Sequence, residues 1–224
     1  MLMVITDHGF LLGEHDWWGK MRMPWYNENA HIPLFVWDPR TKAAGVRRSR
    51  ITQTIDIGPT LLEFFGQDKP ADMQGETLRG VIEDDAPIRD AAIYGMFGGH
   101  VNVTDGRWVY MRAPMPENQP LNHYTLMPTH MRSPFSTGEL ADMQWQAPLA
   151  FTKGCPVMRI PARGMAQLTQ PFTTQLYDLA ADPGQLHPVV DDAAEARMTA
   201  LLADAMAYND APAEQYERLD IAQP

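Results

Sequence analysis

The sequence has little of three features that would each point to a class of protein. It contains one cysteine, Cys155, so it has no internal disulfide and its fold does not depend on an oxidising compartment. Its 18 Lys and Arg residues face 28 Asp and Glu residues, and the net charge of −10 argues against a surface for nucleic acid or anionic lipid. No apolar run is long enough to cross a bilayer. We therefore expect neither a nucleic-acid partner nor a membrane.

What is present indicates a folded, mixed α/β protein. An apolar content of 45% over 224 residues supports a real core in one large domain or two small ones. The first residues lack the regions of a signal peptide, which leaves the compartment open. We place a boundary near residues 85–90, so that the units are 1–88 and 89–224. In the first unit we expect buried strands at 3–6 and 32–37 and a helix at 57–65, with Asp56 as its cap.

The second unit has the pattern of a small α+β domain. Strands are expected at 91–97, 100–104, 108–112 and 175–179, and the Asp105-Gly106 pair predicts a tight hairpin. Residues 193–208 have the spacing of an amphipathic helix, with Asp191 and Asp192 at its start. Residues 113–173 are rich in proline and have few periodic runs. We expect a long loop there.

The most informative stretch is residues 5–20, ITDHGFLLGEHDWWGK. Asp7 and His8 follow an apolar strand, and ligands of open α/β sheets bind beyond the carboxyl ends of strands. A carboxylate beside an imidazole offers oxygen and nitrogen donors to a divalent cation. Lys20 adds a compact positive charge suited to a tetrahedral oxyanion.

At these residues the chain resembles a type I sulfatase of the alkaline-phosphatase-like superfamily. Three further matches follow in the order of that family: the helix segment 54–66, the segment MQGETLRGVI at 73–82, and LYDLAADPGQ at 176–185. The matches cover the C-terminal half of the family's domain. The resemblance therefore implies the C-terminal part of an alkaline-phosphatase-like α/β fold, followed by a small α+β domain with an antiparallel sheet and a C-terminal helix.

The resemblance also implies a set of roles. Asp7 and His8 become ligands of a divalent metal ion, usually Ca²⁺ in this family, with Mn²⁺ or Mg²⁺ as alternatives. Lys20 becomes the catalytic lysine that binds the sulfate. The family's nucleophile is a formylglycine made in a CxPxR-type motif, which this chain lacks. Cys155-Pro156 has its proline one position early and follows the metal motif, so we interpret Cys155 as a structural or surface thiol.

Other residues are assigned with a plainer alternative beside them. His130 and Arg132 lie in a stretch dense in His, Tyr and Arg, and they are the candidates for binding the organic part of the ester, although a polar surface loop is the commoner outcome for such a stretch. Glu14 and His15 are interpreted as scaffold for the loop. Tyr26 and the tryptophans of residues 17–25 are interpreted as packing.

The sequence leaves three functions open. The first is hydrolysis of a sulfate ester by the complete protein, with the isolated chain inactive because the nucleophile and the N-terminal half of the domain are missing. The second is hydrolysis of a phosphonate or phosphate ester in the same superfamily. The third is a truncated, non-catalytic module that binds a partner through exposed sheet surface, and a homo-oligomer is compatible with that surface.

Overall fold

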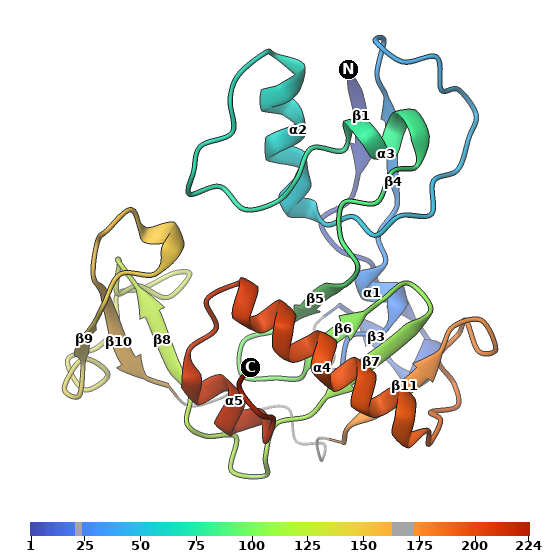
Figure 1. Cartoon of the computed structure of the whole chain (residues 1–224). Helices are drawn as coiled ribbons and strands as arrows, with labels where there is room; N and C mark the ends of the chain where they lie inside the picture. The colour runs from blue at the N-terminus through green and yellow to red at the C-terminus, as the bar shows by residue number, and fades with distance from the viewer. Residues whose placement is uncertain (21–23, 163–172) are drawn as a thin grey trace.

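Two groups of strands and helices follow one another along the chain in the computed structural model, which describes residues 1–20, 24–162 and 173–224. The strands and helices of residues 2–5 and 34–84 form the first group at the top of Figure 1, with the N-terminus. Those of residues 92–219 form the second group below it, with the C-terminus, and residues 18–30 lie beside this second group. This order agrees with the architecture that the resemblance predicts, an α/β part followed by a small α+β part. The boundary at 85–90 stays a prediction, although the first strand of the second group begins at Ala92.

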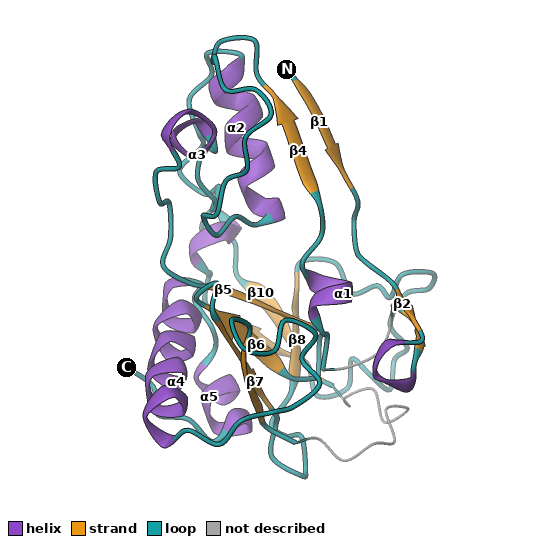
Figure 2. Cartoon of the chain, turned by 90° about the vertical axis from the view of Figure 1, so that its right-hand side faces the viewer, coloured by secondary structure: helices purple, strands orange, loops and turns teal. Residues whose placement is uncertain are grey.

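The first group is built on two antiparallel strands, β1 (Leu2–Ile5) and β4 (Leu34–Trp37), which pair from Leu2↔Trp37 to Ile5↔Leu34. In Figure 2 the helices lie on one side of this pair. The sequence predicts buried strands here, and that prediction is wrong, because no residue of either strand is fully buried. Leu2, Val4, Phe35 and Trp37 point the same way, and each has between 56% and 67% of its surface exposed. Period-2 alternation places these four side chains together on the uncovered face.

Two helices cover the other side of this pair. The helix α2 (Ile57–Phe64) begins with a proline in its first turn and is followed by Gly66, whose φ of 67° is the left-handed conformation that ends helices. The short helix α3 (Arg79–Asp84) follows. A chain of ion pairs, from buried Asp38 to Arg40, Glu63 and Arg79, ties the end of β4 to both helices.

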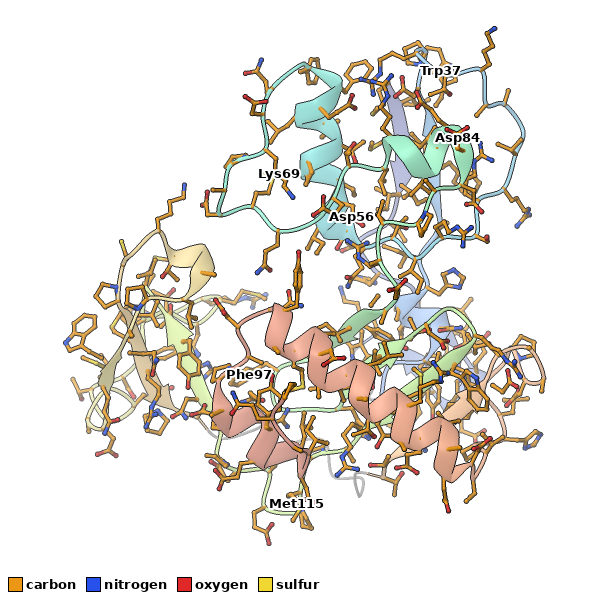
Figure 3. The ribbon with its side chains drawn as sticks, in the orientation of Figure 1. Trp37, Asp56, Lys69, Asp84, Phe97 and Met115 are labelled. Atoms are coloured by element: carbon orange, nitrogen blue, oxygen red, sulfur yellow. The ribbon has the colours of Figure 1, made fainter. Side chains whose placement is uncertain are left out.

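Asp56 has a different role from the cap that the sequence predicts. It occupies the N-cap position of α2, but its carboxylate does not bond the amides of that helix. The carboxylate instead accepts hydrogen bonds from the backbone of Gln53 at 2.7 Å and of Glu76 at 2.9 Å, and it pairs with Arg89. Figure 3 labels Asp56 at the lower end of α2, between the two groups. This fully buried carboxylate therefore links the parts of the chain around residues 53, 76 and 89.

The second group is built on a four-stranded antiparallel sheet in the order β11-β7-β6-β5. Its strands are β5 (Ala92–Gly95), β6 (Val101–Thr104), β7 (Trp108–Arg112) and β11 (Gln175–Asp178). The predicted Asp105-Gly106 turn joins β6 to β7, and the Asp105 carboxylate accepts hydrogen bonds from the backbone of Arg107 and Trp108.

The helix α4 (Asp192–Tyr208) packs across β5, β6 and β7. Asp191 caps it, because its side chain accepts a hydrogen bond from the backbone of Ala194 at 2.9 Å. The core between helix and sheet is apolar and fully buried at its centre, and it contains Val103, Tyr110, Leu176, Met198, Leu202 and Met206. A second helix, α5 (Ala213–Leu219), adds Tyr216 and Leu219 to this core.

Residues 113–173 are not the long loop that the sequence predicts. They contain three strands, β8 (Asn122–Thr125), β9 (Gln144–Gln146) and β10 (Val157–Pro161), which form a separate sheet in the order β8-β10-β9. A short 3₁₀ turn lies at Ala150–Thr152. The strands are short and pair with partners far along the chain, so local alternation gives them little signal.

In the part of the chain that the structure describes, no helix is both long and apolar enough for a membrane span.

Candidate active site

The predicted metal pair lies just past the end of β1, in the turn Thr6-Asp7-His8-Gly9. The Thr6 hydroxyl donates to the carbonyl of His8 at 3.2 Å, and the backbone N–H of His8 donates to Asp7 Oδ1 at 3.1 Å. These bonds turn the chain so that the second oxygen of the carboxylate, Asp7 Oδ2, lies 3.3 Å from Nε2 of the His8 ring. The turn therefore brings the two predicted ligands side by side, with the Asp7 side chain 81% exposed.

The His8 ring has a partner at each nitrogen. Its Nδ1 lies 2.9 Å from the carbonyl oxygen of Gly9, and its Nε2 lies 2.7 Å from Nζ of Lys20. A carbonyl only accepts, so Nδ1 carries the hydrogen, and Nε2 presents its lone pair to the lysine ammonium. The residue that the sequence singles out twelve positions later thus lies in contact with the pair.

A carboxylate oxygen and an unprotonated imidazole nitrogen are donors that suit a divalent cation. Loss of hydration in the turn would raise the pKa of the Asp7 carboxyl, but backbone hydrogen bonds and the neighbouring His8 ring outweigh it, and the pKa lies below its ordinary value. The carboxylate is therefore ionised at neutral pH, as a ligand must be. Among the described residues, no group of three or more His, Cys, Asp or Glu side chains has a metal-binding arrangement. The pair fits part of a cation site.

The hairpin that carries Lys20 is short and anchored at one buried side chain. Strands β2 (Leu11–Leu12) and β3 (Trp18–Gly19) pair as Leu11↔Gly19 and Leu12↔Trp18, around the 3₁₀ turn Glu14–Asp16. Leu11 is completely buried. Glu14 accepts a hydrogen bond from the backbone of Leu12 at 2.6 Å, which agrees with its predicted role in the scaffold.

His15 and the helix α1 (Asn27–Ala30) support this loop through packing and hydrogen bonds. The His15 ring stacks on Tyr26 with 3.5 Å between ring centres, and its Nε2 lies 3.3 Å from the carboxylate of Glu28. The backbone N–H of Gly9 donates to the carbonyl of Asn29 at 2.9 Å. These contacts tie the turn of residues 6–9, the predicted metal turn, to α1. They are structural, as the sequence predicts for His15 and Tyr26.

Two buried amides of the second group hold the same segment, and sequence reasoning missed both. Asn102, in β6, donates through Nδ2 to the carbonyl of Pro24 at 2.6 Å. Gln185 accepts from the backbone N–H of Asn27 at 2.7 Å. Tyr26 then packs on Tyr177 and its buried neighbours in the sheet. The only signal in the sequence for Asn102 is an amide between two valines of a strand.

Comparison with known proteins agrees with this arrangement. Residues 13–108 match the family model described as N-sulphoglucosamine sulphohydrolase, C-terminal. The N-acetylglucosamine-6-O-sulfatase of Bacteroides thetaiotaomicron is 38% identical over 98 residues, which are 42% of this chain and 17% of that protein. Human arylsulfatase K is 38% identical over 73 residues, 33% of this chain and 13% of the relative.

The matched region is similar to the C-terminal portion of sulfatases of the alkaline-phosphatase-like superfamily.

Two solved structures share the fold of this chain. One, bound to its substrate D-glucosamine-2-N,6-O-disulfate, has a TM-score of 0.62 at 20% identity and covers 95% of this chain and 35% of that one. The other, a phosphonate monoester hydrolase from Silicibacter pomeroyi, has a TM-score of 0.55 at 19% identity, with 92% and 34% covered. The chain therefore spans about a third of these proteins, and its matches span less than a fifth of the curated relatives.

The predicted substrate residues lie in the loop between β8 and β9. His130 Nε2 is 2.7 Å from the Glu139 carboxylate, and its ring lies against Phe135. Arg132 is exposed on the same hairpin. In residues 1–20, 24–162 and 173–224, no hydrogen bond or ion pair joins His130 or Arg132 to the metal turn. Their role in binding substrate stays a prediction.

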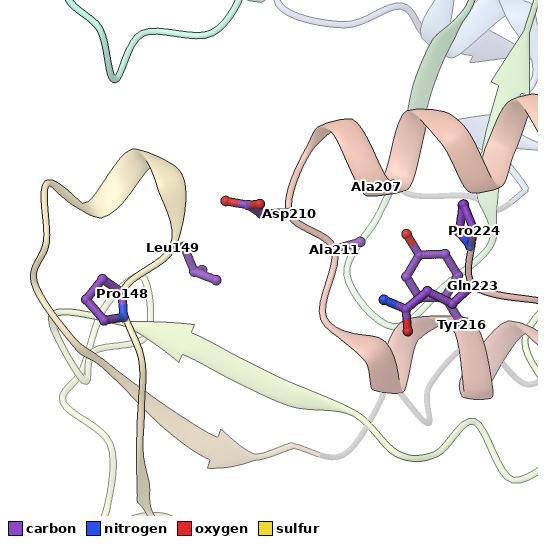
Figure 4. A pocket seen from close by; sticks show the side chains of 8 residues that line it. All are labelled: Pro148, Leu149, Ala207, Asp210, Ala211, Tyr216, Gln223 and Pro224. Carbon is purple, nitrogen blue, oxygen red and sulfur yellow. The ribbon is translucent and has the colours of Figure 1, made fainter.

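Two other features of the chain lie away from the predicted metal turn. Cys155 is an exposed free thiol in a turn, where its backbone bonds Thr152. A hollow of about 270 Å³ opens between the loop at Pro148 and Leu149 and the turn from α4 to α5 (Figure 4). The carboxylate in its lining, Asp210, accepts a hydrogen bond from the backbone of Ala150 at 2.6 Å. Neither feature contains the groups that sulfate chemistry needs.

Proposed function

We propose that the complete protein hydrolyses sulfate esters and that this chain supplies two metal ligands, Asp7 and His8, and the sulfate-binding lysine, Lys20. The observation that carries the proposal is the contact between these residues. Lys20 Nζ lies 2.7 Å from His8 Nε2, and His8 Nε2 lies 3.3 Å from Asp7 Oδ2. The resemblance assigns roles to these three residues from sequence alone, and the fold gathers them in one place.

The three side chains suit the charge that develops when a sulfate ester is cleaved. Asp7 and His8 would hold a divalent cation, which supplies a Lewis acid for the sulfate oxygens and the attacking group. Lys20 places a positive charge beside the same oxygens and stabilises their negative charge in the transition state. A nitrogen ligand is less favourable to Ca²⁺ than to Mn²⁺, so we propose Ca²⁺ by family resemblance, with Mn²⁺ or Mg²⁺ as alternatives.

The ester that we propose to test first is a sulfated amino sugar. One relative is named an N-acetylglucosamine-6-O-sulfatase, and one fold neighbour is bound to a disulfated glucosamine. His130 and Arg132 stay the candidates for contact with the sugar.

A second candidate function is hydrolysis of a phosphonate or phosphate ester. A phosphonate monoester hydrolase shares the fold, and phosphate and sulfate are both tetrahedral oxyanions that a cation and a lysine can bind. The ester that the complete protein turns over distinguishes the two.

We further propose that the isolated chain is inactive. Its relatives are several times longer than the matched region, and two ligands make a weak metal site. The partner that we infer is the N-terminal part of the same α/β domain, which would supply the formylglycine and the other ligands. The uncovered face of β1 and β4 is the surface that such a part would cover.

The test is peptide mapping of the native protein from its source, followed by assays on that protein. We expect a species heavier than 25.2 kDa with a formylglycine peptide and with sulfatase activity that a chelator removes. Lys20→Ala should lower kcat/KM by about 10²- to 10³-fold, as loss of a group that stabilises transition-state charge does. Lys42→Ala, an exposed lysine beyond the far end of β4, is the matched control. Turnover of phosphonate but not sulfate would favour the second candidate, and turnover by the isolated chain would contradict its proposed inactivity.

A further inference from the structure

The lysine of the candidate site is placed where a metal ion would bind. His8 uses Nδ1 to donate to Gly9, so Nε2 holds its free lone pair. That lone pair faces the ammonium of Lys20 at 2.7 Å. Asp7 Oδ2 lies 3.3 Å from the same nitrogen. One imidazole nitrogen therefore serves either the ammonium or a cation.

We propose that Lys20 and the divalent cation compete for Nε2 of His8, so that binding of the cation releases the lysine ammonium toward the oxyanion. This inference rests on the proposed function and adds an order of events to it. With the cation absent, the ammonium occupies Nε2 of the imidazole. With the cation bound, the ammonium leaves His8 and its three N–H donors become available to a sulfate oxygen.

The local structure permits this movement of Lys20 with little change in the backbone. Leu11 is completely buried and pairs with Gly19, which fixes the chain directly before the lysine. The side chain of Lys20 is exposed, and four rotatable bonds let its ammonium move by several ångströms. The movement changes side-chain torsions and leaves the hairpin in place.

Competition also makes the cation and the anion cooperate. A cation that frees the lysine raises the affinity for the anion, and linkage requires the anion to raise the affinity for the cation by the same factor. A lysine that stayed on His8 would instead reduce the affinity for the cation and remain unavailable to the anion.

The first test is calorimetric titration of the complete protein, stripped of metal by a chelator, with Ca²⁺ and with Mn²⁺, using the wild type, Lys20→Met and Lys42→Met. The change at position 20 removes the competitor, so we expect cation affinity to rise about three- to fivefold, the range of an exposed charged pair. The change at position 42 removes the same charge beyond the opposite end of the β1–β4 pair, where screening leaves an effect below about twofold. Equal affinity in all three chains would overturn the competition.

The second test separates displacement from simple charge repulsion. Selective ¹⁵N labelling of histidine and ¹³C labelling of lysine report on His8 Nε2 and on the end of the Lys20 side chain. During the Ca²⁺ titration, both signals should move together, and the Lys20 signal should approach that of exposed Lys42. A His8 signal that moves while Lys20 stays unchanged would overturn the proposal and leave Asp7 and His8 as ligands. Failure of the wild type and Lys20→Met to bind either cation would overturn the metal pair itself.

Discussion

Gly9 shows how a single position controls the geometry of the metal turn. Its backbone N–H bonds the carbonyl of Asn29, and the two segments are so close that a Cβ on Gly9 would lie 1.6 Å from the carbonyl oxygen of Glu28. This distance is far below any van der Waals contact. Glycine is therefore required by close approach of the backbone of α1.

We expect Gly9→Ala to destabilise the protein by about 2 kcal/mol or more, since the clash is with backbone and cannot be relieved by a side chain. The measurement is urea denaturation. Gly58→Ala is the matched control, because its Cβ would lie 3.7 Å from Met73 in ordinary contact and alanine favours a helix. A loss of stability as large in the control as in Gly9→Ala would contradict the argument.

At this scale the sequence predicts the metal turn well and its support poorly. Asp7, His8 and Lys20 are visible because a motif fixes their spacing, and their mutual contacts follow from one turn and one hairpin. Asn102 and Gln185 lie about 80 and 160 positions from the segment that they hold. A polar side chain in a strand gives no sign of which distant carbonyl it will meet.

At the scale of elements, the two long helices and the strands of the four-stranded sheet are predicted, whereas the small sheet and the last helix are missed. The helix at 57–65 is confirmed as Ile57–Phe64, and that at 193–208 as Asp192–Tyr208, because periodicity and caps lie within each segment. The strands of the small sheet and the helix Ala213–Leu219 depend on distant partners. Tertiary contact, which short windows do not contain, determines them.

The hairpin beside the small sheet carries a pH-dependent element. Hydrogen bonds from the backbone and then the side chain of Ser136, followed by His130, lower the pKa of Glu139 from 4.5 to about 2. A carboxyl with a lowered pKa in the folded state stabilises the fold above its unfolded pKa and loses that contribution as it protonates. The contribution of Glu139 should therefore be complete above pH 4.5 and disappear toward pH 2.

We expect the ¹³C signal of the Glu139 carboxyl to titrate with a midpoint near pH 2, and the Ser136 amide signal to follow the same curve. Glu139→Gln should abolish the titration of the Ser136 amide while leaving the fold at neutral pH. A Glu139 midpoint near 4.5 would contradict the hydrogen bonds described here.

At the scale of the whole molecule, the most consequential surface is the apolar face of β1 and β4. Leu2, Val4, Phe35 and Trp37 are exposed together on a two-stranded sheet that has no charged residue in either strand. Natural sheets protect such edges and faces with charge or with another layer. The isolated chain should therefore associate with itself at high concentration.

We expect Phe35→Lys to reduce this self-association, because it places a charge at the centre of the apolar face. The measurement is light scattering over a series of concentrations. Val190→Lys is the matched control, since Val190 is 97% exposed outside this face and its replacement should change scattering little. Equal effects of the two substitutions would mean that general solubility, and not the sheet face, governs association.

The clamp formed by Asn102 and Gln185 bears on how this protein can be divided. These two amides, with Tyr26 packed on the sheet of the second group, hold the segment before β4 against the second group. A protease or a gene designer that separated the chain near residue 88 would cut at a point where the sequence changes character. It would nevertheless separate residues 24–27 from Asn102, Gln185 and Tyr177, which hold them. The chain can be described as two groups, but these contacts join them into one unit.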